Sequence, residues 1–329
     1  MSKKGLLLFS GVFALVLSSC SSGVKHSVDE YMLKLDYKSD YRILQLTDVH
    51  LGDKDALEDH FKFMDLTVKD SNPDLIVVTG DLFTFASRGT ATEFFKYLDS
   101  KGVPWTVTFG NHDEQCYFSV DWMTGVLNEY GSHCVFKDIQ DDDVQGNANF
   151  AINLMKGSSI FEQLIIMDSN RYYYGDYFGY DYFKQDQIDW YSDLVDYTTE
   201  QNGGVAVPSL MFYHIPLPEV NDAWNYAQEN PLAVVYSEGV MGEAACCPEH
   251  DHHFFDVIKN KHSTHGMYFG HDHINNFIVK YEGIDFGYGI KATDRVYYDE
   301  TLLGGRVITL RPDHSLAYEN IYHKYSEVK

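Results

Sequence analysis

Residues 105–113 read WTVTFGNHD, and this stretch decides the fold class. Its first five residues form an uninterrupted run of apolar and β-branched side chains, which is typical of a buried strand. The run ends at Gly110, and Asn111, His112 and Asp113 follow directly. In open α/β sheets, ligands bind outside the carboxyl ends of the strands. We therefore expect this turn to belong to a functional site, although a polar hairpin turn would give the same pattern.

Four other short apolar runs end in the same way. Residues 41–47 stop at Asp48, residues 75–79 at Gly80 and Asp81, residues 210–213 at His214, and residues 266–269 at Gly270 and His271. Helical patterns cover residues 55–70, 92–100 and 184–200. This alternation of strands and helices predicts an α/β fold. Residues 277–322 combine short strands with glycine-rich turns, and we expect them to complete the sheet in antiparallel fashion.

The side chains at these five strand ends are of the types that bind metal ions. Histidine is the commonest metal ligand, and carboxylate and amide oxygens accompany it on hard or borderline cations. Each motif alone has a plain alternative: an aspartate after a strand is usually a turn or cap residue, and a lone histidine is usually a hydrogen-bonded core residue. Five such motifs in this order predict a metal site.

These motifs together resemble the five sequence blocks of the calcineurin-like metallophosphoesterases, over about residues 41–310. The segments HIPLPE (214–219) and GHDHINNF (270–277) are similar to the purple-acid-phosphatase-like branch of that family. The resemblance implies a four-layer α/β/β/α sandwich of two mixed sheets. The purple enzymes carry a tyrosine ligand three positions after the aspartate of the second block. Thr84 stands there in this chain, so purple Fe(III)–tyrosinate chemistry is not expected.

The resemblance also implies two metal ions, which would be Fe, Mn or Zn. The first would be held by Asp48, His50, Asp81 and His273, and the second by Asp81, Asn111, His214 and His271. His112 would stay off both metals and protonate the leaving oxygen, while Asp113 would orient its ring by accepting the other N–H. A structural turn carboxylate is the alternative role of Asp113. The implied activity is phosphomonoester hydrolysis by a metal-bridged hydroxide. Phosphodiester or nucleotide hydrolysis is the alternative within the enzyme class, and a lipoprotein that binds metal or phosphate is the alternative outside it.

The charge balance fits this chemistry. The 329 residues contain 49 acidic and 25 basic residues, which gives a formal net charge of −24. Such a chain repels nucleic-acid backbones unless a basic patch intervenes, and no block of five or six Lys or Arg residues exists. An anionic phosphate ester must then be attracted by bound cations instead.

The amino terminus is interpreted as a targeting signal for export. Lys3 and Lys4 precede an apolar run over residues 5–17, which is too short to span a bilayer and fits a signal peptide. The run ends in small residues and Cys20, which resembles a bacterial lipoprotein cleavage box; an ordinary secretory peptide with an incidental cysteine is the alternative. We expect a signal peptide at residues 1–19, a lipidated tether at 20–39 and one metallophosphoesterase domain at 40–329, anchored to a membrane through Cys20.

Four further features carry weaker expectations. Export permits disulfides, and Cys116 with Cys134 is the favoured local pair, with free thiols as the alternative and Cys246 and Cys247 left over. Residues 250–253 (HDHH) are interpreted as a solvated loop rather than a metal cluster. Residues 172–182, dense in Tyr and Gly, are expected to form an exposed loop over the site, in which the rings pack on one another; stacking on nucleotide bases is the alternative. Arg295, in a late loop, is a candidate substrate contact.

Overall fold

The computed structural model describes residues 26–54, 56–139, 143–236 and 239–328. The predicted signal peptide and the lipidated Cys20 lie outside these residues. No helix in the described ranges is long and apolar enough to cross a membrane.

The first sheet has five strands in the order β15-β14-β2-β3-β4. Strands β2 (Tyr41–Leu46), β3 (Leu75–Thr79) and β4 (Trp105–Thr108) run parallel, which is typical of the predicted α/β fold. Strands β14 (Gly304–Leu310) and β15 (Leu316–Tyr322) add antiparallel edges. Every residue of β3 and β4 is buried, which explains why these two segments read as continuous apolar runs rather than alternating ones.

The second sheet has eight strands in the order β1-β5-β6-β9-β11-β13-β12-β10. Four consecutive strands of this sheet run parallel to one another: β6, β9, β11 and β13. Strand β12 is antiparallel to β13 and to β10. Their bounds are β1 Met32–Asp36, β5 Phe150–Lys156, β6 Ser159–Ile166, β9 Ser209–Phe212, β10 Val234–Tyr236, β11 Thr264–Phe269, β12 Ile278–Tyr281 and β13 Ile284–Tyr288. A separate two-stranded hairpin is formed by β7 (Tyr172–Tyr174) and β8 (Phe178–Tyr180).

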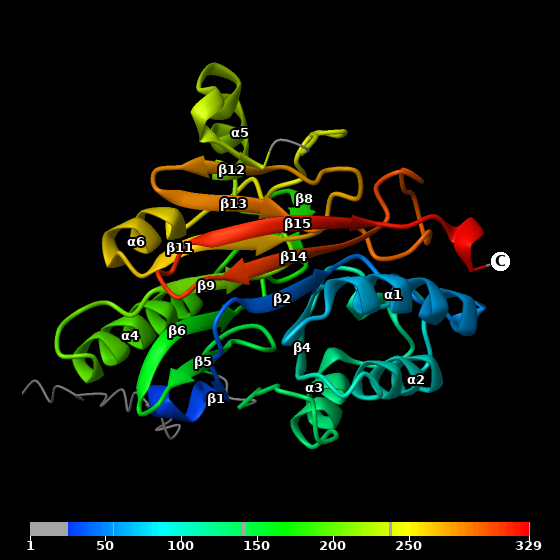
Figure 1. Cartoon of the computed structure of the whole chain (residues 1–329), viewed down its shortest axis with the longest axis horizontal. Coiled ribbons are helices and arrows are strands. Elements are labelled where there is room, and N and C mark those ends of the chain that lie inside the picture. The colour runs from blue at the N-terminus through cyan, green and yellow to red at the C-terminus, as the bar shows by residue number, and fades with distance from the viewer. Residues whose placement is uncertain (1–25, 55, 140–142, 237–238, 329) are drawn as a thin grey trace, which may run out of the picture.

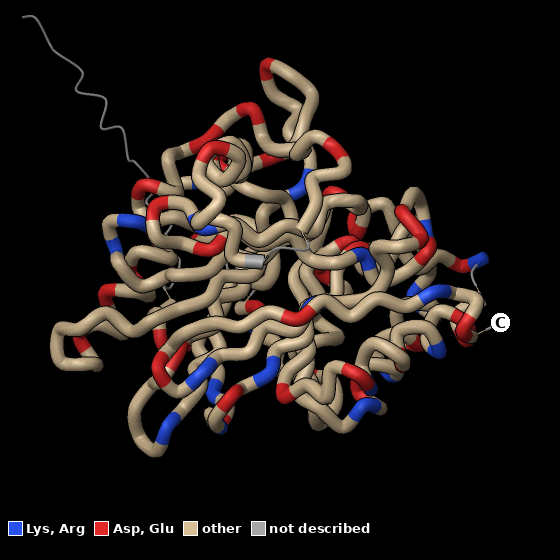
Figure 2. The backbone as a smooth tube through the Cα atoms, turned by 45° about the horizontal axis from the view of Figure 1, so that its top comes forward, with Lys and Arg blue, Asp and Glu red and all other residues tan. Residues whose placement is uncertain are grey.

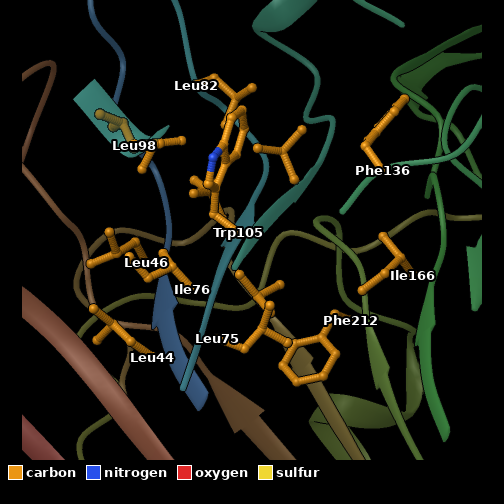
Figure 3. Packing of buried hydrophobic residues seen from close by; sticks show 14 of the residues in the cluster. Leu44, Leu46, Leu75, Ile76, Leu82, Leu98, Trp105, Phe136, Ile166 and Phe212 are labelled. Atoms are coloured by element: carbon orange, nitrogen blue, oxygen red, sulfur yellow. The ribbon is translucent and has the colours of Figure 1, made fainter. Parts of the chain in front are cut away.

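Helices cover the outer faces of both sheets, which gives the predicted four-layer sandwich (Figure 1). Helices α1 (Leu57–Ser71), α2 (Arg88–Asp99) and α3 (Val120–Asn128) pack on the five-stranded side. Helices α4 (Gln185–Gln201), α5 (Glu219–Glu229) and α6 (Phe254–Lys261) pack on the eight-stranded side. Between the sheets, side chains such as Leu75 of β3, Ile166 of β6 and Phe212 of β9 belong to one continuous core (Figure 3).

The helix ends show local sequence control. Helix α1 stops at Asn72, whose φ of 42° is left-handed, and Pro73 follows. A left-handed residue closes a helix, and proline shortly after it prevents continuation. Helix α2 begins at Arg88, four residues before the predicted start, and α4 matches its prediction within one residue at each end.

Two expectations about chain boundaries are corrected by the structure. The folded domain begins before residue 40, because β1 pairs in parallel with β5 inside the segment that was predicted to be a tether. The late strands do not complete a single sheet: β12 and β13 extend the eight-stranded sheet, where β13 runs parallel to β11, while β14 and β15 join the five-stranded one. Connections that switch between sheets leave no mark in the apolar pattern of a strand.

The predicted Cys116–Cys134 disulfide is wrong, since both cysteines are free, as are Cys246 and Cys247. Cys116 and Cys134 both pack against the apolar core beside α3 and β4, and Cys134 donates a weak hydrogen bond to Leu127 O at 3.6 Å. Burial raises the pKa of both thiols to about 12, so they stay protonated. They fill space as small apolar groups.

Candidate metal centre

The carboxyl ends of the five predicted strands meet where the two sheets face each other. Asp48 and His50 follow β2, Asp81 follows β3 and Asn111 follows β4, while His214 follows β9 and His271 and His273 follow β11. A hydrogen bond from Gln45 Nε2 to Phe269 O at 3.1 Å joins the two sheets here. Another, from Thr47 Oγ1 to Thr79 O at 3.0 Å, links the end of β2 to β3 within the first sheet. The fold therefore gathers six of the seven predicted ligands in one place, and Asn111 directly precedes His112, whose backbone N donates to Asp81.

Two of the motif glycines permit this close approach. Gly80 has a φ of +82°, and a Cβ on it would lie 2.5 Å from Nδ1 of His214. A Cβ on Gly110 would lie 2.3 Å from an oxygen of Asp81. Any larger residue would push the loops apart, so each glycine is required for the position of the side chain beside it.

Four of the predicted ligands adopt left-handed backbone angles. The φ values are 53° for Asp48 and His50, 50° for Asp81 and 80° for His271. Such angles cost about 1–2 kcal/mol for non-glycine residues and cluster at functional sites. Backbone hydrogen bonds hold the strained turns in place, for example from His50 N to Asp81 O at 2.9 Å.

The side chains form two groups that share one carboxylate. One ligand atom from each of Asp48, His50, Asp81 and His273 lies within 4.8 Å of the others, and the same holds for Asp81, His214 and His271. Oδ2 of Asp81 lies 3.5 Å from Nε2 of His50 and 3.3 Å from Nε2 of His214. Asp81 thus occupies the position between the groups that a bridging ligand needs.

Neighbouring groups fix the direction of three imidazoles. In each, Nδ1 lies 2.8 Å from an oxygen, which leaves Nε2 facing the cluster: Thr84 Oγ1 for His50, Thr79 O for His214 and Tyr297 O for His273. Such outer hydrogen bonds set the tautomer and orientation of metal-binding histidines. Thr84 therefore stands behind a candidate ligand, and it supplies no phenolate.

Buried atoms without partners show that the residues fit a metal site. Both ring nitrogens of His271 are buried and have no hydrogen-bond partner, and neither does Oδ1 of Asn111. Asn111 donates from Nδ2 to the Tyr172 hydroxyl at 2.8 Å, so its carbonyl oxygen remains available. Buried polar atoms are almost always satisfied, and a bound cation would satisfy these. The mixed nitrogen and oxygen donors suit Mn, Fe or Zn ions.

The electrostatics favour the ligating protonation states of His50, His271 and Asp81. His214 is the exception: burial opposes its charged form, but the charge of Asp81 outweighs burial and raises the pKa of His214 to about 10, so a cation must displace a proton from this ring. Burial lowers the pKa of His50 and His271 well below the usual value, which keeps both imidazoles neutral. Burial disfavours the Asp81 carboxylate, but the neighbouring charged His214 outweighs burial and holds the pKa of Asp81 well below its usual range. Neutral imidazoles and an ionised carboxylate are the forms that bind cations.

His112 lies beside the cluster and outside both groups. Its ring centroid is 5.0 Å from that of His50, its backbone N donates to Asp81 Oδ1 at 2.8 Å, and its side chain is partly exposed. The expectation that Asp113 orients this ring is wrong. The Asp113 carboxylate accepts from the backbone N–H groups of Phe83 and Gly110 at 3.0 and 2.8 Å, whereas Nδ1 of His112 lies 2.8 Å from Oε1 of Gln115.

Sequence reasoning missed two neighbours of the cluster. Gln115 also donates from Nε2 to the Tyr172 hydroxyl at 3.1 Å, which links His112 to the tyrosine-rich segment. Lys291 is fully buried and donates from Nζ to the backbone oxygen of Asp48 at 2.9 Å, and burial lowers its pKa to about 8. The spacing of Gln115 from His112 carried a usable signal, but no local pattern marks Lys291.

The weaker expectations have mixed outcomes. The tyrosine-rich segment is the β7–β8 hairpin, and it does reach the site, since the Tyr180 ring lies edge-on to His271 with centroids 4.3 Å apart. Within the described residues, the groups able to hold a metal ion do not include residues 250–253, and His250 instead contacts Asp176 at 3.0 Å. Arg295 lies in the same loop as Tyr297, and its contact with substrate stays a prediction.

Comparisons relate this chain to known proteins. The model of the calcineurin-like phosphoesterase family matches residues 41–286. The chain is 26% identical over 294 residues to probable inactive purple acid phosphatase 14 of Arabidopsis thaliana, covering 78% of this chain and 71% of that protein. It is 24% identical over 270 residues to phosphatase DCR2 of Saccharomyces cerevisiae, covering 73% of this chain and 45% of the yeast protein. A solved dimetal phosphatase from Danio rerio shares the fold, with a TM-score of 0.52, 13% identity, and coverage of 87% of this chain and 98% of that one.

Proposed function

The chain belongs to the calcineurin-like phosphoesterases, and on that premise we propose that it hydrolyses phosphomonoesters at a dimetal centre. Asp48, His50, Asp81 and His273 would hold one ion, and Asp81, Asn111, His214 and His271 the other. Such ions, when bound, neutralise the phosphate charge and activate a water for attack. In a chain with a net charge of −24, they would also supply the attraction for an anionic substrate.

The observation that carries the proposal is the position of His112. It lies next to the cluster and partly open to solvent, yet it belongs to neither ligand group. Gln115 holds its Nδ1 edge, which leaves Nε2 free to face a bound ester. A proton donated from Nε2 to the leaving oxygen would ease departure of an alkoxide, and such catalysis typically contributes 10²–10⁴-fold.

Two other functions remain as second candidates. The same site would serve phosphodiester or nucleotide hydrolysis if the leaving group carried a second ester. A protein that binds metal or phosphate without turnover is favoured by the word "inactive" in the name of the Arabidopsis relative. A binder has no use for a histidine beside the ligands that ligates nothing, so His112 supports the enzyme.

The test uses the purified protein after removal of metals and reconstitution with Mn, Zn or Fe. Alkyl monoesters, nitrophenyl phosphate and a bis-nitrophenyl diester are assayed in parallel with metal analysis. We expect two metal equivalents and a preference for monoesters. His112→Ala should keep both metals and lose about 10²–10⁴-fold in kcat on alkyl phosphates, with a smaller loss on nitrophenyl phosphate. A fully loaded protein that turns over none of the esters would refute the enzyme, and loss of metal in His112→Ala would refute its role.

A further inference from the structure

The β7–β8 hairpin presents four aromatic side chains on one face. Tyr172 pairs with Tyr180 across the two strands, and Tyr174 pairs with Phe178. Because side chains alternate along a strand, these four point to the same side, and the intervening Tyr173 points to the other. The ring centroids of Tyr172 and Phe178 are 5.9 Å apart at 19°, and those of Tyr172 and Tyr180 are 6.1 Å apart at 25°.

The inner end of this face is attached to the candidate metal centre. The Tyr172 hydroxyl accepts a hydrogen bond from Asn111, and the Tyr180 ring packs edge-on against His271. Asn111 and His271 belong to the same proposed ligand set. A phosphoryl group held at the metals would therefore have this aromatic face directly beside it.

The outer end of the same face is open to solvent. Tyr174 is 74% exposed and Phe178 is 70% exposed, although both are large aromatic residues. Their rings contact each other, with centroids 5.3 Å apart. Residues two apart on a strand are about 7 Å apart, so the surface from Tyr172 to Tyr174 matches the length of a two-ring aromatic group.

The two sides of the hairpin differ in the charged groups that lie near them. None of its four side chains is charged. The nearby ammonium group of Lys184 lies over the ring of Tyr182 at 3.5 Å and near that of Tyr173, on the opposite side, and it is paired with Asp181. A leaving group that carries a second phosphate would find no cation on the aromatic face, whereas an uncharged planar group would stack on it.

From this arrangement we infer that the β7–β8 face binds the ester group of the substrate, and that the substrate class is phosphomonoesters whose ester group carries a planar aromatic ring, such as aryl or nucleoside monophosphates. This inference rests on the proposed function for the phosphate end of the substrate. The metal cluster binds the phosphate, and Phe178 with Tyr174 stacks on the ring of the leaving group.

The test measures equilibrium binding, so that it does not depend on turnover. Naphthalene-1-phosphonate and propylphosphonate, neither of which can be hydrolysed, are titrated into the metal-loaded protein by calorimetry. We expect the naphthyl compound to bind at least tenfold more tightly. Phe178→Ala should weaken naphthyl binding about three- to tenfold and leave propyl binding within twofold, because one stacked aromatic pair contributes a factor of this size.

Two matched variants make the result specific. Phe178→Tyr keeps the aromatic plane and should retain naphthyl binding, while Tyr173→Ala removes a ring from the opposite face of the same hairpin and should leave the preference unchanged. Equal binding of the two phosphonates, no binding of either, or an equal loss of both in Phe178→Ala would overturn the inference. If the preference is found but no monoester is hydrolysed, the proposed activity fails and the aromatic subsite stands. If monoesters are hydrolysed without any aryl preference, only the subsite fails.

Discussion

Replacing Asp113 by alanine should lower the free energy of unfolding of the protein and leave its kcat nearly unchanged. The Asp113 side chain is completely buried, and its two oxygens accept the backbone N–H groups of Phe83 and Gly110 at 3.0 and 2.8 Å. Alanine would leave both donors buried without partners. Each such donor costs about 1–3 kcal/mol, so the two together cost about 2–6 kcal/mol.

Because the carboxylate is itself buried, the expected loss in the free energy of unfolding lies in the lower half of that range. Burial, together with the nearby charge of Asp81, raises the pKa of Asp113 to about 8, so the ionised form is disfavoured in the fold. Alanine removes that penalty. We therefore expect the free energy of unfolding to fall by about 2–4 kcal/mol, and by about half as much in Asp113→Asn, which keeps one acceptor oxygen.

Urea unfolding of the metal-loaded protein measures this change, with kcat normalised to bound metal as the second readout. The matched control is His112→Ala, which keeps both hydrogen bonds of Asp113 and should lose activity without losing stability. Asp113→Ala should stay within about threefold of wild-type kcat when folded, far from the 10²–10⁴-fold of a lost general acid. Wild-type stability combined with a loss of activity as large as that of His112→Ala would refute the structural assignment.

Four further outcomes are expected. Asp81→Ala should lose both metals while Asn111→Ala loses chiefly one, which elemental analysis of purified variants measures; two full equivalents in Asp81→Ala would contradict the bridging position. Gln115→Leu should keep both metals and lower kcat about tenfold with unchanged KM, more on alkyl than on aryl phosphates, because the proposed acid loses its orienting acceptor; an unchanged alkyl/aryl ratio would exclude that role. Burial raises the pKa of half-buried Glu219 from 4.5 to about 7, so the folded state holds its proton more tightly and the unfolding free energy falls as pH rises through that window. Glu219→Gln should therefore be stabilised relative to wild type at pH 8 and not at pH 4.5, by about 1–2 kcal/mol after allowance for solvent screening, and thermal melts showing no such crossover would count against it. Cys20→Ala should abolish metabolic labelling with a fatty acid, and equal labelling of wild type and variant would rule out the lipid anchor.

The strand ends could be predicted from sequence because their signal is local. Each apolar run is followed within one or two residues by its polar side chains, and burial on both faces makes the strands stand out. Contacts between segments that are far apart in the sequence have no such local signal. The buried Lys291, 243 residues from Asp48, and the Tyr297 carbonyl that orients His273 depend on how a late loop packs. No periodicity in either segment encodes that packing.

Outside the site, too, the elements with a local sequence signal were predicted, and those that depend on contacts between distant segments were not. Strand β1 carries a mixed burial pattern with three half-buried and two exposed residues, so it lacks the apolar run that identified the other strands. It is a strand because it pairs with β5, more than a hundred residues away. The free cysteines follow the same logic: nearness in sequence favoured a bridge between Cys116 and Cys134, whereas packing against the core decided their state.

The local backbone explains why Asp113 does not contact the imidazole of His112. Adjacency to His112 suggested that its carboxylate would meet the imidazole. However, residues Asp113–Gln115 form a short 3₁₀ turn directly after His112. In a 3₁₀ turn, side chains three positions apart lie on the same side, so Gln115 is the residue that faces the ring and Asp113 turns back toward the strand. The spacing His-x-x-Gln after the strand end at Gly110 and Asn111 therefore indicates the partner of the His112 ring, which adjacency in the chain does not.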